Sequence, residues 1–310
     1  MEELISVVVP VFNAQRTLDQ TLLSIRSQSY RNIEVLVIDD GSIDKSAEIA
    51  ARHAKIDARI RLIKQANAGV AAARNRGIAE AKGDLIAPID ADDLWTAKKL
   101  ERQIAAMIEG GPEVGLVYCW YACIDQDSYI TTVIKPQATG RVLPEVCSAN
   151  IVGSGSAPLM RKHFVLAASG YSTDLRAARA QGCEDWLLYA RLAERSEFRV
   201  VQQCLVGYRR MSGTMSENVP QMLKSFELLS AELIRRHPYS AAYLKWGRIN
   251  LSIWLAGSAI RSRQFHTAAG LLGFVAISAP LFFITAVTKR ALWRISRIAN
   301  REIFEIGPVL

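Results

Sequence analysis

The first 118 residues alternate short apolar runs with longer segments of helical character. Five runs have the length and β-branched content of strands, and they cover Ile5–Val11, Ile33–Ile38, Ile60–Ile63, Leu85–Ile89 and Val114–Tyr118. Between them, Leu18, Leu22 and Ile25 fall on one face of a helix, and helix formers fill Val70–Ala81 and Lys98–Ile108. This alternation predicts βαβ units, and therefore an α/β fold with a mainly parallel, Rossmann-like sheet flanked by helices.

From Tyr121 to Val206 the pattern is looser, because glycine and proline interrupt short runs. One clear helix begins near Asp185 and places Leu188 and Leu192 on one face. We expect this part to line the open side of the sheet. No linker rich in Gly and Ser precedes it, so residues 1–217 are assigned to one domain and residues 218–310 to a helical C-terminal region.

The C-terminal region contains a long uncharged segment. Thr267–Thr288 spans 22 residues without a charge, and Lys289 and Arg290 follow it. That length could cross a bilayer, but two glycines and Pro280 interrupt the segment. We therefore expect a pair of helices that lie on the membrane face or dip into it, with a true span as the alternative.

A basic and an apolar face follow this segment. The cations are Arg290, Arg294, Arg297 and Arg301, and the apolar residues are Leu292, Ile295, Ala299, Ile303 and Ile306. Cations beside an apolar face suit an anionic lipid surface. The alternative is an ordinary amphipathic helix that docks on its own protein.

Composition narrows the class of protein. With 310 residues, of which 50% are apolar and 22% charged, the chain can build a packed core, and disorder is excluded. The net charge of +8 and a pI near 9.3 favour anionic partners such as phosphates, nucleic acid or acidic lipids. The five cysteines include no C-x-x-C pair, and no secretory leader is evident. These features indicate small buried side chains in a reducing cytosolic compartment rather than structural zinc.

Two acidic clusters directly follow predicted strands, where ligands bind in open α/β sheets. They are Asp39-Asp40-Gly41-Ser42 and Asp90-Ala91-Asp92-Asp93. Three carboxylates within four residues repel one another unless they share a cation, and oxygen ligands favour Mg²⁺ or Mn²⁺. The alternative is that Asp92 and Asp93 cap a helix over Trp95–Ile108, which leaves Asp90 unexplained.

Four segments, in this order, resemble the family 2 glycosyltransferases with the GT-A fold. They are Ser6–Asn13 (SVVVPVFN), Val37–Ser42 (VIDDGS), Asn67–Gly77 (NAGVAAARNRG) and Pro88–Trp95 (PIDADDLW). Each is short, but four in order at strand ends make a specific signal. The resemblance covers roughly residues 4–215.

The resemblance implies a site for a nucleoside-diphosphate sugar donor. In the family, the residue matching Asp40 hydrogen-bonds the nucleotide base, and the turn Pro10–Phe12 matches the backbone wall of that site. Asp90 and Asp92 match the D-x-D pair, with Asp92 on the metal and Asp90 nearer the ribose. Arg74 matches a cation near the nucleotide. The alternatives are an Asx turn for Asp40 and a solvated helix surface for Arg74.

Glycosyl transfer also needs a general base, because a sugar hydroxyl is a poor nucleophile at neutral pH. The segment Gly182-Cys-Glu-Asp-Trp-Leu resembles the family's E-D motif. The resemblance implies that Asp185 is the base of an inverting enzyme, with Glu184 in a supporting part at most. The alternative is that Asp185 is the N-cap of a helix over Trp186–Ala193.

Tyr208-Arg209-Arg210 resembles a C-terminal Y-R motif of the family, whose cation can lie near the pyrophosphate. Met211 stands where many members have His two residues after that Arg, which leaves the role of Arg209 open. No Q-x-x-R-W motif follows, as processive polysaccharide synthases would show. The resemblance therefore implies transfer of one sugar per encounter.

The expected protein is a metal-dependent inverting glycosyltransferase that moves a hexosyl or N-acetylhexosaminyl group. Its donor would be a nucleoside-diphosphate sugar, with uridine the family's commonest base. Its acceptor would be a sugar or lipid-linked hydroxyl, in cell-surface polysaccharide or glycolipid synthesis at the inner face of the cell membrane. The motifs fix neither the sugar, the acceptor nor the oligomeric state.

Two other classes fit the sequence less well. A nucleotidyltransferase would need a glycine-rich basic loop after the first strand, where this chain has Pro10-Val-Phe-Asn13. A nucleic-acid-binding protein would need a basic groove interleaved with aromatics, whereas the regular basic face lies in the C-terminal region. We therefore expect no nucleic-acid partner.

Overall fold

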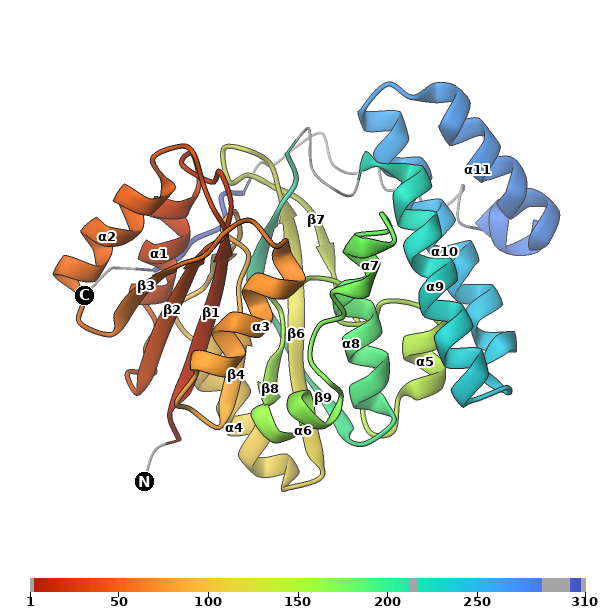
Figure 1. Ribbon diagram of the computed structural model, residues 1–310. Helices are drawn as coiled ribbons and strands as arrows, with labels where there is room; N and C mark the ends of the chain where they lie inside the picture. The colour runs from red at the N-terminus through yellow and green to blue at the C-terminus, as the bar shows by residue number, and fades with distance from the viewer. Residues whose placement is uncertain (1–2, 212–216, 286–301, 308–310) are drawn as a thin grey trace.

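The computed structural model describes residues 3–211, 217–285 and 302–307. A single mixed sheet forms its centre, with the strand order β3-β2-β1-β4-β8-β6-β9-β5 and with β7 beside β6 (Figure 1). The strands are β1 Ile5–Val11, β2 Ile33–Asp39, β3 Ile60–Lys64, β4 Leu85–Pro88, β5 Leu94–Trp95, β6 Val114–Ile124, β7 Ile130–Ile134, β8 Leu159–Arg161 and β9 Glu197–Arg209.

The first four strands are parallel and end at one edge of the sheet. Strand β1 lies between β2 and β4, with Ile5 in register with both Ile33 and Leu85. Every residue of β1 and β2 is buried, so both faces of the sheet are covered. Continuous apolar runs such as these are typical of parallel strands covered on both sides. The carboxyl ends of β2 and β4 carry the two acidic clusters.

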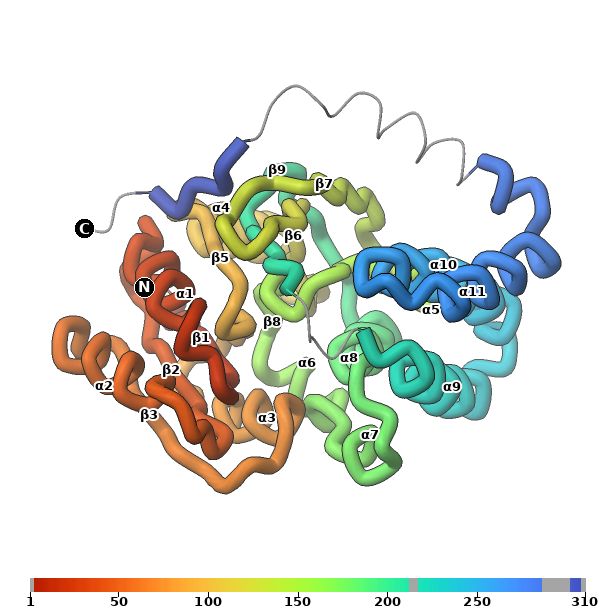
Figure 2. The backbone as a smooth tube through the Cα atoms, turned by 90° about the horizontal axis from the view of Figure 1, so that it is seen from above, coloured from red at the N-terminus to blue at the C-terminus, as the bar shows by residue number. Residues whose placement is uncertain are grey.

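Helices surround the sheet in two groups. They are α1 Leu18–Arg26, α2 Ser46–Ile56, α3 Val70–Glu80, α4 Lys99–Gly110, α5 Leu143–Ser148, α6 Lys162–Ala167, α7 Asp174–Ala177, α8 Glu184–Ala193, α9 Val219–Arg236, α10 Ser240–Arg261 and α11 Phe265–Ser278. Figure 2 shows α1 and α2 on the side of β1 to β3, and α5 with α8 to α11 on the opposite side. The predicted α/β class is confirmed.

The second half of the domain is more regular than its sequence pattern indicates. Strand β6 extends to Ile124, and the 13-residue strand β9 pairs with it in parallel. The expected loose region therefore contains a central pair of strands. Exposed Gln202 and Gln203 and three shifts of register break the apolar alternation of β9, which explains why the pattern hides it.

The acidic cluster after β4 does not cap a helix, so that alternative is wrong. The two-residue strand β5 separates Asp93 from α4, where it pairs with β9. Helix α4 begins at Lys99, its N-cap is Lys98, and no side chain caps it. Asp92 and Asp93 are thus free for other roles.

The C-terminal region is helical over residues 219–278, as expected. Helix α11 ends at Ser278, before Pro280, because a proline ring cannot continue the helical hydrogen bonding. Within residues 3–211, 217–285 and 302–307, no helix is both long enough and apolar enough to cross a bilayer. The arginine face at 290, 294, 297 and 301 and the apolar positions 292, 295 and 299 lie outside the described residues.

Residues 302–307 are extended and pack against the sheet, so the expected helix does not include Ile303 and Ile306. The backbone N–H of Phe304 donates to the carbonyl of Ser128 at 2.9 Å, and the ring of Phe304 is buried. The ring fits above Gly207, where a Cβ atom would lie only 2.9 Å from it. This end of the chain lies beside α1, far from α11 (Figure 2).

Candidate active site

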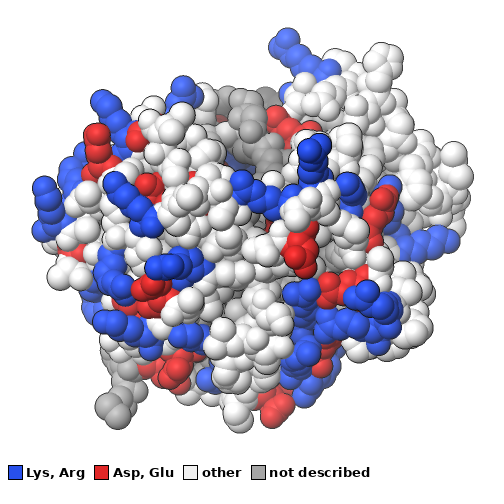
Figure 3. Space-filling model, viewed as in Figure 1, with Lys and Arg blue, Asp and Glu red and all other residues white. Residues whose placement is uncertain are grey.

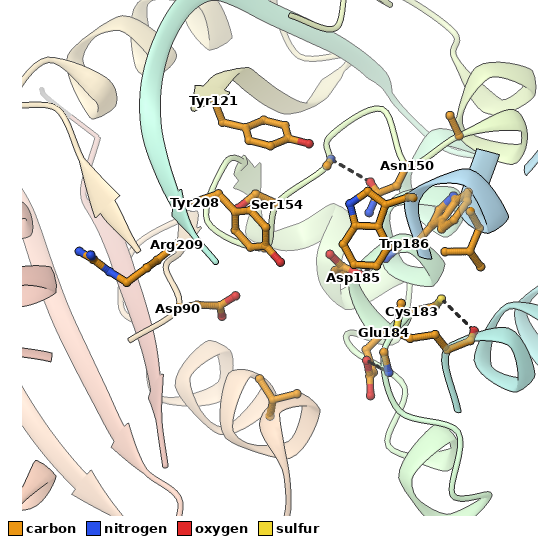
Figure 4. Close-up of a pocket in the computed structure, with 18 of the residues that line it drawn as sticks. Asp90, Tyr121, Asn150, Ser154, Cys183, Glu184, Asp185, Trp186, Tyr208 and Arg209 are labelled. Atoms are coloured by element: carbon orange, nitrogen blue, oxygen red, sulfur yellow. Dashed lines mark hydrogen bonds between the residues drawn. The ribbon is translucent and has the colours of Figure 1, made fainter. Parts of the chain in front are cut away.

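A cavity of about 420 Å³ lies beyond the end of β4, between the sheet and α8. Five of the residues predicted from the sequence line it together: Arg74, Asp90, Asp92, Asp185 and Arg209. Its volume is within the range of small-molecule sites. Segments far apart in the chain thus converge on one space, as Figure 4 shows for Asp90 and Asp185, which enter it from two sides.

Arg74 is buried, so the solvated-surface alternative is wrong. Its Nη2 atom donates to Oδ1 of Asp90 at 2.5 Å, and its guanidinium stacks 5.0 Å from the ring centre of Tyr171. The Nε atom is also buried, and it has no hydrogen-bond partner among the described residues. A buried donor without a partner costs free energy, so the burial of this N–H is an unfavourable contribution to the stability of the fold.

Asp92 and Asp93 have different surroundings although they are adjacent. Burial and the negative charge of Asp90 raise the pKa of Asp92 to about 7. Asp93 is fully buried, and its carboxylate accepts hydrogen bonds from Ser156 Oγ at 2.5 Å and from the Arg209 N–H at 2.8 Å. Asp93 therefore holds strand β9 and the 154–156 loop against the end of β4.

The three carboxylates therefore do not share one cation. In the described part of the chain, no group of three metal-binding side chains occurs. Asp92 and Asp90 both line the cavity. Their negative charges repel each other because water screens them poorly there, and a bound divalent cation would remove this repulsion. Two carboxylates completed by diphosphate oxygens suit Mg²⁺ or Mn²⁺, so the residues fit such a cation.

Asp185 lies in the first turn of α8, and the N-cap is Cys183. The alternative that Asp185 caps the helix is therefore wrong, because α8 begins one residue earlier, at Glu184. Burial raises the pKa of Asp185, and the nearby cation of Arg74 opposes this shift. Glu184 turns back and accepts the N–H of Gly182 at 2.8 Å, so it supports the start of the helix.

Asp40 shapes the loop that leads into α3. Its carboxylate accepts hydrogen bonds from the side chain of Gln65 and the backbone N–H groups of Ala68 and Gly69, at 2.7 to 2.8 Å. The side chain that accepts a backbone N–H of this turn is that of Asp39, whose Oδ1 atom accepts the N–H of Ser42 at 3.0 Å. The sequence analysis offered Asp40 as the turn residue, whereas in the structure the residue before it, Asp39, has this role.

The predicted wall of the base site lies at the same sheet edge. Pro10 is buried within β1 in register with Ile38 of β2, and Phe12 is 54% exposed just beyond the strand. Neither residue lines the 420 Å³ cavity, and nor does Asp40. Their contact with a nucleotide base stays a prediction.

The guanidinium of Arg209 faces away from the cavity (Figure 4). Its five N–H groups donate to five acceptors, which are Asp92 O, Asp125 O, Gln126 O, Gln20 Oε1 and Ser128 Oγ. In this arrangement Arg209 fixes the backbone of Asp92 and of the 125–128 loop. The geometry makes it a positioning residue rather than a direct ligand of pyrophosphate.

The sequence analysis missed most of the small residues around the ion pair. Ser156 Oγ donates to Asp93 and accepts the N–H of Asp90 at 2.9 Å. A Cβ atom on Gly155 would lie 2.7 Å from Arg74 Nη2 and 2.9 Å from Asp90 Oδ2. The run Gly153-Ser-Gly-Ser-Ala-Pro158 is the signal, since such small residues permit close approach of other groups.

The fold and the site define a class of protein. An α/β sheet whose acidic strand ends face a small-molecule cavity is the arrangement of the GT-A glycosyltransferase fold. The sequence profile described as glycosyl transferase family 2 matches residues 6–162. The chain belongs to this family.

Two curated relatives match part of the chain at moderate identity. An uncharacterized glycosyltransferase of Haemophilus influenzae is 47% identical over 107 residues, which is 34% of this chain and 43% of the relative. The Escherichia coli UDP-Glc:alpha-D-GlcNAc-diphosphoundecaprenol beta-1,3-glucosyltransferase WfgD is 36% identical over 135 residues, 43% of this chain and 52% of the relative. The chain therefore spans about half the length of these relatives.

Two solved structures share the fold at low identity. S. aureus TarS, residues 1–349, in complex with UDP-GlcNAc has a TM-score of 0.60 and 15% identity, with 90% of this chain and 82% of that chain covered. The mannosyltransferase PcManGT of Pyrobaculum calidifontis in complex with GDP-Man and Mn²⁺ has a TM-score of 0.58 and 18% identity, with 95% and 81% covered. Each likeness covers at least 90% of this chain, so the shared fold extends beyond residues 6–162.

Proposed function

We propose that this protein transfers one sugar from a nucleoside-diphosphate sugar to an acceptor hydroxyl, with inversion at the anomeric carbon. The observation that carries this proposal is the shared cavity of Asp90, Asp92, Arg74 and Asp185. Family membership supports the reaction class. A uridine donor is favoured, because WfgD is named for UDP-Glc and the TarS structure holds UDP-GlcNAc.

Asp185 is the proposed general base. It takes the proton of the acceptor hydroxyl while the oxygen attacks the anomeric carbon from the face opposite the diphosphate, so the product has inverted configuration. Burial raises its pKa, which makes it a stronger base than an exposed aspartate, and the cation of Arg74 opposes this shift. The cation of Arg74, which lines the same cavity, would attract the anionic groups of the donor.

Asp92, with Asp90 beside it, would hold Mg²⁺ or Mn²⁺. When bound, such a cation stabilises negative charge on the diphosphate leaving group. A structural neighbour contains Mn²⁺ with its nucleotide sugar, which supports this choice of cation. The positions of Asp92 and Asp90 do not depend on the cation, because Arg209 holds the Asp92 carbonyl and Ser156 holds the Asp90 N–H.

Thermal unfolding with a panel of nucleotide sugars tests the donor proposal. We expect UDP or a UDP-sugar with Mn²⁺ to raise the Tm, by an amount equivalent to about 2.7 kcal/mol at 100 times Kd. The Asp92→Asn variant should lose the part of the shift that depends on Mn²⁺. The Asp185→Asn variant should keep the full shift and lose sugar transfer. If no nucleotide changes the Tm, the proposed donor site is wrong.

We also propose that α10 and α11 rest on an anionic membrane surface, where a lipid-linked acceptor would be found. Helix α11 has no Lys, Arg, Asp or Glu, and large apolar side chains are exposed on it and just after it, at Phe265, Phe274, Ile277 and Leu281. In Figure 3 the surface over α11, at the upper right, carries few charged side chains. The net charge of +8 favours anionic lipid.

Vesicle sedimentation of the full chain tests membrane association. We expect binding to vesicles of phosphatidylglycerol and phosphatidylcholine, with weaker binding to pure phosphatidylcholine. The Ile277→Glu variant should reduce binding, whereas Ile56→Glu, a matched change at an exposed residue of α2, should not. If the wild type is instead a dimer by light scattering and Ile277→Glu makes it monomeric without affecting vesicles, the apolar face is a protein interface.

A further inference from the structure

The cavity extends beyond the carboxylates toward the C-terminal helices. Its far wall is formed by side chains of four elements, namely Asn150 after α5, Trp186 of α8, Met222 of α9, and Asn250 and Trp254 of α10. Four of these five residues lie outside residues 6–162, the part that matches the family profile. This wall is therefore a feature of the chain's own C-terminal half.

Two contacts with backbone carbonyls at the end of α5 fix α10 in this position. A Cβ atom on Gly247 would lie 2.4 Å from the carbonyl oxygen of Cys147, so the helix approaches the end of α5 closely. One turn later, Nδ2 of Asn250 donates to the carbonyl of Ser148 at 2.9 Å. Trp254 follows Asn250 by four residues and so lies on the same face of α10, toward the cavity.

The chemistry of the wall selects among possible ligands. Two indole rings and two primary amides dominate it, and no lysine occurs among the described residues that line the cavity. Of its two arginines, Arg74 is paired with Asp90 and Arg209 donates to protein acceptors. Asp185 and Glu184 stand on the same side and repel anions.

A neutral ligand with apolar faces and polar edges matches these groups. A pyranose ring has this form, since its C–H groups pack on an aromatic face and its hydroxyls bond with amides. An alkyl phosphate would find no unpaired cation on this wall, and a plain lipid chain would leave the amides without partners. The side chain of Asn150 accepts the N–H of Gly153 at 2.9 Å, so its amide is already oriented.

We propose that the wall formed by Trp254, Asn250, Asn150 and Trp186 is the acceptor subsite, and that it binds a sugar ring whose hydroxyl is presented to Asp185. This inference rests on the proposed function and names the class of its acceptor. Trp254 supplies the stacking surface of the subsite. The C-terminal half thus sets acceptor specificity, whereas the half that matches the family profile binds the donor.

Saturation-transfer NMR on the full chain with UDP and Mg²⁺, which is diamagnetic, tests this subsite. The probes are the methyl glycosides of glucose, galactose, mannose and N-acetylglucosamine, together with hexyl phosphate. We expect at least one glycoside to bind, with affinity about tenfold weaker in Trp254→Leu and within about threefold of wild type in Trp254→Phe. Trp246→Leu, the same change on an exposed tryptophan of α10 outside the cavity, should leave binding unchanged.

The outcomes separate this inference from the donor proposal. Absence of glycoside binding, equal losses in the two Trp→Leu variants, or binding of hexyl phosphate that alone depends on Trp254 would each overturn the acceptor subsite. The Tm shift produced by UDP and Mg²⁺ is measured on the same samples and should be the same in all three variants. If UDP still shifts the Tm but no glycoside binds, only the acceptor assignment is wrong. If UDP does not shift the Tm of the wild type, the proposed donor site is wrong.

Discussion

The Nη2 atom of Arg74 lies 2.5 Å from Oδ1 of Asp90, and this ion pair joins helix α3 to the residues that follow strand β4. Arg74 is 5% exposed, whereas the side chain of Asp90 is 29% exposed to the cavity. The pair therefore has a buried cationic end and an accessible anionic end. The positive charge of Arg74 also acts on Asp185, where it opposes the rise in pKa that burial causes.

Gly155 leaves the space that this ion pair occupies. In a Gly155→Ala variant the new Cβ atom would lie 2.7 Å from Arg74 Nη2 and 2.9 Å from Asp90 Oδ2, which displaces both side chains. Since a displacement of about 1 Å at a reacting centre can cost 10²-fold, we expect kcat/KM to fall by up to about 10²-fold. Steady-state sugar transfer measures the loss.

Gly270→Ala on α11 is the matched control. Apart from its own helix backbone, no atom of the described residues lies within 4 Å of the added Cβ position, so activity should not change. Helix propensity should raise stability by up to about 1 kcal/mol. Equal activity in Gly155→Ala and wild type would show that the geometry of the ion pair does not matter for transfer.

Asp185→Asn removes the proposed base but keeps the shape of the side chain. The amide oxygen can still accept the N–H of Trp186, which Asp185 accepts at 2.7 Å. Loss of general-base catalysis typically costs on the order of 10²–10⁴-fold, so kcat should fall by that factor while donor binding is kept. Single-turnover transfer and nucleotide-dependent Tm shifts distinguish the two effects. Near-normal turnover would show that another group accepts the proton.

The same substitution should stabilise the fold in a pH-dependent way. Burial raises the pKa of Asp185, so ionisation is harder in the folded than in the unfolded chain. The folded chain is more stable while Asp185 is protonated. This contribution to stability is lost as the pH rises from the pKa of Asp185 in the unfolded chain through its raised pKa in the folded chain. The Tm gain of Asp185→Asn over wild type should therefore grow across that interval and level off above it.

Arg74 provides a check on this assignment, because its cation favours the ionised form of Asp185. In an Arg74→Gln background the gain from Asp185→Asn at neutral pH should be larger than in the wild-type background. Thermal scans of the four proteins form a double-mutant cycle. Additive effects would mean that Arg74 does not influence Asp185.

Phe304 attaches the end of the described chain to the sheet. Its ring is buried with Leu94, Ala122 and Ile124 in a small cluster apart from the main core. Replacing a buried Phe by Ala costs about 3 kcal/mol or more, so Phe304→Ala should lower the free energy of unfolding by about that amount. Denaturant unfolding measures the change. Ile303→Ala, at a neighbouring residue that is 55% exposed, should change it by less than about 0.5 kcal/mol.

Local sequence was sufficient to predict the N-terminal strands of the fold. The strands at 5–11, 33–38 and 60–63 agree with β1, β2 and β3 to within one residue, because continuous apolar runs bounded by turn residues reflect burial on both faces. The same elements predict where the acidic residues lie in the chain. Asp90 and Asp92 come after strand β4, and Asp185 lies in the first turn of α8. Their membership of one cavity depends on strand order, which no local pattern contains.

The surroundings of individual side chains required the tertiary structure. Arg74, on a helix rich in alanine, is buried only because Tyr171 and Gly155 approach it from segments about 80 to 100 residues away in the chain. Arg209 donates to acceptors on three separate segments, and Asp93 accepts hydrogen bonds from Ser156 and strand β9. Hydrophobic periodicity reports which face of an element is buried, and it carries no information about which distant polar group meets that face. For this reason the elements and motifs of this protein can be predicted along the chain. Charge pairing, the cavity wall on α10 and the docking of Phe304 arise only when distant segments pack together.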